Sequence, residues 1–269
     1  MKSKSIATNA AGAVQSLARG LRLLQLMCDA ADGTSVSVLA EVAGLAPATT
    51  HRLLRTLLAS GFVRQLPTRD YALGPALLRL RERAGKMLGA WAQPTLAKLV
   101  EATDETANFA LLYGNQVVYV AQVPSKHTMR MFTEVGRSVM PHCTGVGKAI
   151  LSQLPDAEVL AILSQTGMPA QTPRTKTDPA ELLDELREVR RCGYAVDNGE
   201  QEIGVRCVAV PVPWNATRAA ISVSGPALRL QASDTERVAK VMMSLASEIA
   251  AAFHEKEAGR TADPTATPR

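Results

Sequence analysis

SVLAEVAGLAPATTHRLLRTLLASG, residues 37–61, combines two short helical patterns separated by a turn. Ser37 can cap the first helix, and Gly44 can end it because glycine readily adopts the left-handed conformation that closes a helix. Pro47 suits the first turn of the second helix, where its missing N–H costs nothing, and that helix runs to Gly61. Two helices joined by so short a turn predict a helix-turn-helix.

The second helix separates leucines from polar side chains. The predicted buried stripe consists of Leu53, Leu54, Leu57 and Leu58. The side chains left to the other faces are Thr49, Thr50, His51, Arg52 and Arg55. In helices of this kind the N-terminal residues enter the major groove, where Arg can bond guanine and hydroxyls can bond bases or phosphates. We expect these five residues to contact DNA, the alternative being an ordinary solvated polar face.

The segments on either side complete a small domain. An earlier helix, ending near residues 31–33, is predicted from apolar residues at steps of three and four, namely Val14, Leu17, Leu21, Leu24 and Met27. These five should pack on a core. After Gly61, residues 62–66 and 71–73 flank a turn at 67–70 and predict a hairpin. This hairpin would be a wing, with Arg64 and Arg69 near backbone phosphates.

The positive charge of the chain is concentrated at its N-terminal end. Residues 1–80 hold nine Lys or Arg against four Asp or Glu, whereas residues 81–269 hold twenty-one of each. The formal net charge of +5 therefore belongs entirely to the first 80 residues. Because neutralised phosphates supply most non-specific DNA affinity, a basic domain joined to a neutral one fits a DNA-binding module with a partner domain. A solvated basic face is the alternative.

Composition excludes several other classes of protein. The four cysteines are scattered, without zinc-ribbon spacing or the density of a secreted disulfide scaffold, which favours a reducing cytoplasm. We find neither a signal-peptide pattern nor an apolar run long enough to span a membrane, so no membrane partner is expected. Aromatic residues make up only 4% of the chain and give the basic end no stacking platform, which argues against single-stranded nucleic acid as the ligand.

The remainder of the chain alternates strand and helix patterns. Strands are predicted at residues 106–112, 116–123, 129–134, 194–196, 205–212 and 219–224, with helices at 180–192 and 233–253. Strands that precede and separate helices in this way indicate an α+β fold with an antiparallel sheet.

The segment HCTGVGKA, residues 142–149, invites a nucleotide-binding interpretation that fails on spacing. A P-loop needs glycine where His142 stands and Ser or Thr where Ala149 stands. What remains is a glycine turn entering a helix, whose free N–H groups at residues 145–147 suit one carboxylate. The alternative is that these glycines serve close packing alone.

An enzymatic site is the second interpretation of this part of the chain. Cys143 beside His142 suggests a nucleophile pair, but adjacent residues point apart, so the motif forms no dyad. His127 and His254 lack ligand spacing, and neither a metal nor another cofactor is expected. An enzyme that processes a small carboxylate would reveal itself by turnover of the bound acid.

Four blocks of sequence together resemble the IclR family of bacterial transcriptional regulators over nearly the whole chain. They are VQSLARGL at 14–21, TTHRLL at 49–54, HCTGVGKA at 142–149, and the block that runs from DNGE at 197–200 through Gly204, Cys207 and Pro211 to SVSGP at 222–226. The resemblance implies a winged helix-turn-helix, a GAF-like effector domain, and homodimers or homotetramers on double-stranded operator DNA. Ala48 departs from the family, which often has Ser there, so one hydroxyl contact to DNA is in doubt.

The resemblance also implies the sites. Arg19, in the first block, joins the expected DNA contacts. An effector, expected to be a small carboxylate metabolite, would be bound by Gly145, Val146, Asp197, Cys207, Ser222 and Ser224. Each of these has a structural alternative: a buried Cys is usually a small hydrophobe, and Asp197 beside Asn198–Gly199 could simply make a turn.

The predicted organisation is a flexible arm at 1–13, a winged helix-turn-helix at 14–74, a linker helix at 75–90, an effector-binding domain at 91–254 and a disordered tail at 255–269. The function expected is that of an effector-responsive regulator, repressor or activator, which controls a catabolic operon. Effector binding would shift the pairing of subunits and so the spacing of their recognition helices.

Overall fold

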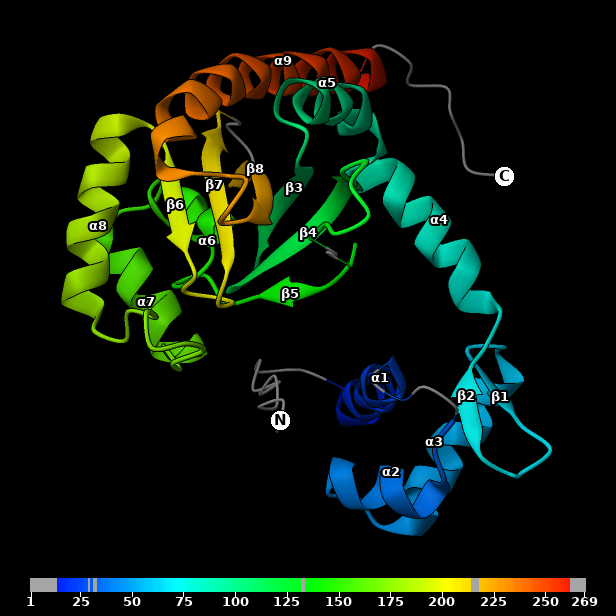
Figure 1. Ribbon diagram of the computed structural model, residues 1–269. Coiled ribbons are helices and arrows are strands. Elements are labelled where there is room, and N and C mark those ends of the chain that lie inside the picture. Colours follow the sequence, from blue (N-terminus) through cyan, green and yellow to red (C-terminus); the bar gives the residue numbers. More distant parts are fainter. Residues whose placement is uncertain (1–13, 29, 31–32, 132–133, 214–217, 262–269) are drawn as a thin grey trace. The chain divides into compact units, whose positions relative to one another are not determined.

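A computed structural model describes residues 14–28, 30, 33–131, 134–213 and 218–261 (Figure 1). The chain divides into two compact units, Met1–Ala84 and Gly85–Arg269. The predicted arm at 1–13 and the last part of the predicted tail, residues 262–269, lie outside the described residues.

The first unit is a winged helix-turn-helix. Its elements are α1 (Gln15–Cys28), α2 (Val36–Ala43), α3 (Pro47–Ala59), β1 (Val63–Gln65) and β2 (Tyr71–Leu73). The two strands pair antiparallel and form the predicted hairpin. Every element gives at least one side chain to a common apolar core, which contains Leu23, Met27, Leu39, Leu54, Val63 and Tyr71. This core holds α3 against the rest of the domain.

The cap of α2 differs from the prediction. Ser35, not Ser37, is the capping residue: its backbone is extended and its hydroxyl accepts a hydrogen bond from Val38 N at 3.3 Å. Ser37 already lies within the first turn of the helix. Gly44 ends α2 with a φ of 65°, as predicted, because the left-handed turn into α3 requires it.

Helix α1 buries only part of the face expected: of the five predicted residues, Met27 lies in the core and Leu24 packs against it. Its buried residues are Gly20, Leu23 and Met27, whereas Val14, Leu17 and Leu21 are 65%, 62% and 52% exposed. Two apolar stripes share this helix, and only one of them meets the core. In α3, likewise, Leu54 is fully buried while Leu58 is 39% exposed, so Leu58 does not belong to the core stripe.

Helix α4 (Ala76–Leu88) follows the wing and has no buried residue. It continues through Gly89 into the short helix η1 (Ala90–Ala92) and then α5 (Gln93–Thr103). Gly89 lies directly against strand β4 (Gln116–Val123), since a Cβ there would come within 2.2 Å of Val120 O. Only glycine permits so close an approach.

A six-stranded antiparallel sheet forms the centre of the second unit. Besides β4 it contains β3 (Thr106–Tyr113), β5 (Ser138–Val139), β6 (Ala195–Asn198), β7 (Val205–Val212) and β8 (Ala219–Pro226), in the order β5-β4-β3-β8-β7-β6. The strand predicted at 129–134 is wrong for its described residues: 129–131 and 134 lie outside any strand, and the edge strand comes later, at β5. Val120 is a bulge, because the register shifts between Phe109 and Ala110.

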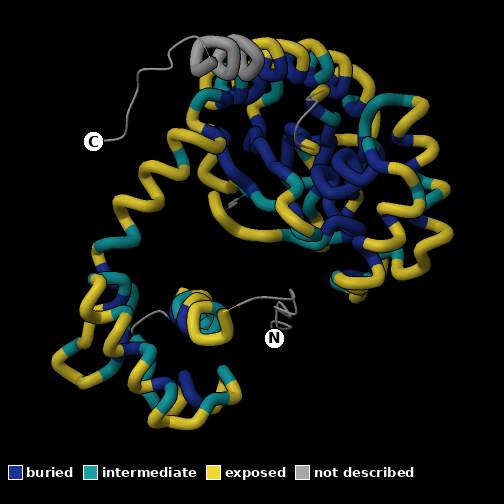
Figure 2. Tube along the Cα trace, turned by 180° about the vertical axis from the view of Figure 1, so that it is seen from behind, coloured by how far each residue is buried: buried dark blue, intermediate teal, exposed yellow. Residues whose placement is uncertain are grey.

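Helices cover both faces of the sheet (Figure 1). Helix α5 and the long α9 (Thr235–Thr261), which follows η2 (Ala232–Asp234), pack on one face around Phe109, Ile221 and Met242. Helix α6 (Gly145–Leu151) packs on the other face, and α7 (Asp156–Thr166) and α8 (Pro179–Cys192) pack against α6. Figure 2 shows the strands buried between these layers. Because α9 continues to Thr261, the disordered tail predicted from residue 255 is wrong for residues 255–261.

Candidate functional site

The exposed face of α3 carries most of the polar residues predicted to read DNA. His51, Arg52 and Arg55 are exposed, and Thr49 is partly exposed. The burial of Leu54 on the opposite side fixes this orientation. Thr56, which is not among the predicted contacts, is also exposed on this helix.

Thr50 does not belong to this face. Its side chain is fully buried, and its hydroxyl donates to Ala46 O at 3.3 Å. A hydroxyl held in this way cannot reach a base or a phosphate, so the predicted DNA contact is wrong in this structure. Thr50 instead packs the start of α3 against the domain.

Hydrogen bonds make the wing turn rigid. Leu66 N donates to Asp70 O and Arg69 N to Leu66 O, while the Thr68 hydroxyl donates to the Asp70 carboxylate at 3.0 Å. Arg69 adopts a φ of 71°, which is rare for a residue with a side chain. Arg69 is exposed in the turn between β1 and β2.

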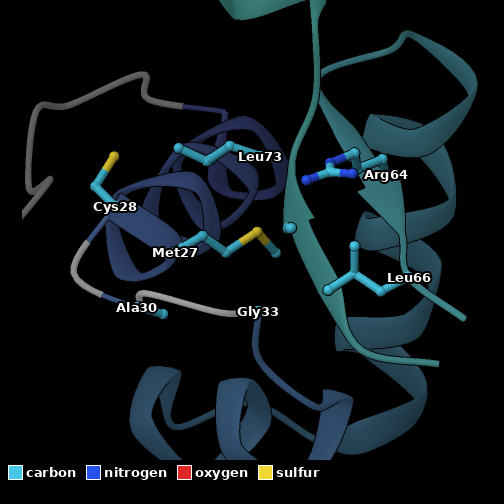
Figure 3. Close-up of a pocket in the computed structure, with 8 residues that line it drawn as sticks. Met27, Cys28, Ala30, Gly33, Arg64, Leu66 and Leu73 are labelled. Carbon is cyan, nitrogen blue, oxygen red and sulfur yellow. The ribbon is translucent and has the colours of Figure 1, made fainter. Parts of the chain in front are cut away.

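Arg64 borders a hollow of about 380 Å³ in the same unit (Figure 3). The hollow lies between the end of α1 and the wing and is lined by Met27, Cys28, Ala30, Gly33, Arg64, Leu66, Ala72 and Leu73. The Arg64 guanidinium is directed toward this space, yet the residue remains exposed. Arg19, on α1, is partly exposed.

The sheet brings four polar side chains into one row beneath α6. Asp197 lies opposite Cys207, Cys207 opposite Ser224, and Ser224 opposite Thr106. Residues directly opposite one another in an antiparallel sheet share a face. Asp197, Cys207 and Ser224, which are far apart in the sequence, are therefore neighbours, and Thr106 extends the row.

A second row runs parallel to the first. Ser222 lies opposite Asn108, and Asn108 lies opposite Gln122. Asn108 Nδ2 donates to Ser222 Oγ at 3.4 Å, and Gln122 Nε2 donates to Asn108 Oδ1 at 3.2 Å. Sequence reasoning missed Thr106, Asn108 and Gln122. The signal was present in β3, where Thr106 and Asn108 alternate with apolar residues.

The start of α6 lies over these rows. Thr144 caps the helix, and its hydroxyl accepts a hydrogen bond from Gly147 N at 3.2 Å. The prediction that the N–H of Gly147 is free is therefore wrong. Among the described residues, no hydrogen-bond partner is assigned to the backbone N–H of Gly145 or Val146. A Cβ on Gly145 would lie 2.7 Å from Cys207 Sγ, and one on Gly147 would lie 2.3 Å from Pro141 O. Both glycines thus serve close packing as well.

A buried ion cluster fixes the other end of the site. Lys148 is fully buried, and its Nζ lies 2.7 Å from Glu185 Oε1 and 2.5 Å from Glu200 Oε1. Burial lowers the pKa of Lys148, but the two carboxylates outweigh burial and raise it. Lys176 also binds Glu185, at 2.6 Å.

Asp197 connects the cluster to the polar rows. Its Oδ1 accepts from Glu200 N at 2.7 Å and from Gln201 N at 3.4 Å. These bonds close the turn that the structural alternative anticipated, and the side chain also faces Cys207. Burial raises the pKa of Asp197 to about 6, although the Glu200 N–H and Lys148 act in the opposite direction.

Two further buried groups, Tyr119 and Cys143, interact with Asp197. Tyr119, on β4, packs with α6, and burial, together with Cys207 and Asp197, raises its pKa. Burial also raises the pKa of Cys143 to about 12 and that of Cys207 to about 11. The Cys143 thiol donates to Gln201 Oε1 at 3.1 Å, whereas His142 Nε2 lies 3.2 Å from Pro169 O. The two neighbours therefore have separate partners. Among the described residues, no group of three potential ligands could hold a metal ion.

Two family models match this chain in the order of its two units. An IclR helix-turn-helix domain matches residues 16–67, and the bacterial transcriptional regulator IclR C-terminal domain matches residues 86–251. The chain belongs to the IclR family. It is a DNA-binding transcriptional regulator, and because the family and its named relatives are regulators, the enzyme interpretation is set aside.

Individual IclR-family proteins support this assignment. The acetate operon repressor of Salmonella typhimurium is 35% identical over 255 residues, covering 90% of this chain and 91% of that protein. Transcriptional repressor IclR of Escherichia coli is 34% identical over 256 residues, covering 91% and 92%. The crystal structure of an IclR transcriptional regulator from Alicyclobacillus acidocaldarius has a TM-score of 0.79 at 30% identity, over 89% of this chain and 99% of that one.

The described helices include none that combines the length and the apolar character needed to cross a lipid bilayer.

Proposed function

We propose that this regulator binds duplex operator DNA through α3 and the wing, and that a small carboxylate bound between α6 and the sheet changes its operator affinity. The observation that carries the proposal is the convergence beneath α6 of two polar rows, which contain Asp197, Cys207, Ser224 and Ser222. A binding site for a small metabolite needs a few convergent polar groups in a buried setting. The two rows bring such groups together from β3, β6, β7 and β8, which are far apart in the sequence.

A carboxylate suits the donors available. Gly145 and Val146 offer backbone N–H groups at the positive end of α6, and the hydroxyls of Ser222 and Ser224 can donate from the floor. The same face leaves little room beside the polar rows, since Ala209, Ala220 and Ala110 already pack against α6. This combination favours a short acid.

The DNA contacts follow from the exposed face of α3. Arg52 and Arg55 are placed to reach base edges, while Thr49 and His51 begin the same face. Arg69 at the wing tip, Arg64 and Arg19 are assigned to phosphates. The likeness to the acetate operon repressor supports a catabolic operon as the target, with the protein working in the cytoplasm.

Fluorescence anisotropy tests both parts of the proposal. The duplex is the DNA upstream of the gene for this protein, titrated with and without a panel of small carboxylates. One acid should change the operator affinity, and the operator should change the affinity for that acid by the same factor, because linkage is reciprocal. Ser222→Ala and Ser224→Ala should weaken the response, and Ser164→Ala, on the surface of α7, should leave it unchanged. Operator binding that no acid alters would refute the effector assignment.

Substitutions on α3 distinguish a loss of base contacts from a loss of folding. Arg52→Ala or Arg55→Ala should weaken specific binding by about 1–3 kcal/mol, roughly 5- to 150-fold. Thr50→Val is the matched control, because its buried hydroxyl faces away from DNA. If both arginine variants bind the operator with unchanged affinity, α3 does not read bases in the major groove.

The exposed stripe of α1 supports a homodimer as the DNA-binding form. Val14, Leu17 and Leu21 recur at steps of three and four, the spacing of a seam between two paired helices. Two half-sites require two recognition helices related by a two-fold axis. Leu17→Glu should therefore lower the sedimentation coefficient, whereas Leu160→Glu, which alters a 43% exposed leucine on α7, should not. If Leu17→Glu sediments like the wild type, the dimer does not use this stripe.

A further inference from the structure

Asp197 lies among more negative than positive charge. The charged groups of its cluster are Lys148 on α6, Glu185 on α8, Glu200 after β6, and Lys176 before α8. With Asp197 ionised, these five groups sum to one net negative charge. The other titratable groups that face it are Cys143, Cys207 and Tyr119, whose pKa values are raised by burial, so all three are neutral at physiological pH.

The only buried cation of the cluster is already engaged. Lys148 Nζ lies within 2.7 Å of one oxygen of Glu185 and one oxygen of Glu200. Its charge is shared between those two partners and cannot also neutralise Asp197 and an incoming anion. His142 lies nearby, but burial and Lys148 lower its pKa and keep it neutral.

A carboxylate effector would therefore be a second uncompensated anion in a buried site. Two carboxylates in one site cannot both stay ionised without a large cost, so one of them takes up a proton. The effector is the weaker candidate to accept it, because short carboxylic acids lose their proton at lower pH. Asp197 is the stronger candidate, since Glu185 and Glu200 each hold the Lys148 ammonium group, whereas Asp197 accepts from backbone N–H groups and burial raises its pKa to about 6.

We infer that the effector enters this site as a monoanion accompanied by one proton, which Asp197 holds while the effector is bound. This inference rests on the proposed function, namely that an acid binds between α6 and the sheet. Both backbone N–H donors reach Asp197 Oδ1, so Oδ2 can carry the proton and donate a hydrogen bond to the effector. The uptake is a plain protonation, with the proton supplied by solvent.

The same charge count defines the class of effector. A dicarboxylate would add a second negative charge that no remaining group of the cluster can neutralise. The site should therefore prefer monocarboxylates of two to four carbons, with or without a keto or hydroxyl group, over dicarboxylates of equal length. Propionate against malonate and 2-oxobutyrate against oxaloacetate are matched pairs for the comparison.

Isothermal titration calorimetry of the wild-type full-length protein measures the proton directly. Each acid is titrated at pH 7.5 in phosphate and in Tris, which differ in ionisation enthalpy, and the difference in heat gives the protons taken up per site. The expected result is close to one proton at pH 7.5 and about half a proton at pH 6. Affinity should fall about tenfold for each pH unit above 7, as a linked protonation requires.

Asp197→Asn provides the variant test, because it keeps the shape of the side chain and removes the titration. The variant should bind the same monocarboxylate without proton uptake and with an affinity independent of pH between 6.5 and 8.5. Asp156→Asn, on α7 and outside the cluster, is the matched control and should keep the wild-type linkage. Since the wild-type heats alone decide the question, a poorly folded variant does not prevent an answer.

Two outcomes would overturn the inference in distinguishable ways. If a monocarboxylate binds with no proton uptake at pH 7.5, or if a dicarboxylate binds more tightly than its matched monocarboxylate, the proton on Asp197 is wrong while the effector site stands. If no acid of either class binds at any pH from 5.5 to 8.5, the proposed effector site fails and the inference fails with it.

Discussion

Removing the buried cation of the effector domain should destabilise that domain severely. Lys148→Met replaces the ammonium group with an apolar chain of similar length and leaves Glu185 and Glu200 without their shared partner. Glu200 is especially sensitive to this loss, since its buried Oε2 already has no hydrogen-bond partner among the described residues. Breaking a buried ion pair by removing one partner costs about 3–5 kcal/mol, because the other charge remains buried.

Urea denaturation followed by tryptophan fluorescence measures this loss. Both tryptophans of the chain, Trp91 and Trp214, belong to Gly85–Arg269, so the signal follows the unit that contains Lys148. With a denaturant slope of about 2.5 kcal/mol per molar urea, the expected cost corresponds to a midpoint lowered by about 1.2–2 M. The slope itself should not change, because the fold is retained.

Lys98→Met is the matched control. Lys98 lies 2.7 Å from Glu248, but the two side chains are 58% and 47% exposed. Exposed pairs contribute about 0–1 kcal/mol, so the midpoint should move by less than about 0.4 M. If the two substitutions shift the midpoint equally, the Lys148 cluster is not the strong buried interaction inferred from its geometry, and the charge count around Asp197 fails with it.

Three further predictions concern single residues. Gly147→Ala should destabilise the protein by about 1–3 kcal/mol in the same urea assay, because the added methyl group would overpack against Pro141 O. Gly85→Ala, in an open part of α4, should instead stabilise the protein by up to about 1 kcal/mol. The reverse order of stabilities would contradict the packing described for Gly147. At pH 8, alkylation followed by mass spectrometry should label the exposed Cys28 promptly and Cys143 only after unfolding. The reason is that burial shields the Cys143 thiol and raises its pKa to about 12. Early labelling of Cys143 would show that this thiol is not buried. Arg69→Ala should reduce the slope of log affinity against log salt by about 1, and an unchanged slope would exclude a phosphate contact.

Local signals made the helix-turn-helix predictable. The proline at the start of α3 and the glycine at the end of α2 determine the backbone conformation of only a few neighbouring residues. Both lie where they were expected. Periodicity was less reliable for α1. It identifies which faces are apolar but not which apolar face meets the core, and so Val14 and Leu17 were assigned to the wrong side. The edge strand was misplaced for a related reason, because strand propensity does not show whether a partner is available.

The candidate effector site was predictable only in part. Asp197, Cys207 and Ser224 came from the family resemblance, and the strand register places them side by side. Tyr119 had no comparable signal, because the bulge at Val120 shifts the alternation of β4 and hides which face Tyr119 occupies. Lys148 is separated by 37 residues from Glu185 and by 52 from Glu200, and no spacing rule predicts a pair across such distances.

The contact between Gly89 and Val120 couples two distant stretches of sequence, because any side chain at residue 89 would displace the backbone at residue 120. Residue 89 follows the connecting helix, Val120 is the bulge of β4, and Tyr119 beside it packs against α6. Recombination that takes residue 89 from a relative must also keep a glycine there and a bulge at 120. A chimera that inherits only one of them would fold with a displaced strand beside its sensor. Successful exchange of sensing domains among these regulators should therefore carry its crossover point on the N-terminal side of residue 89.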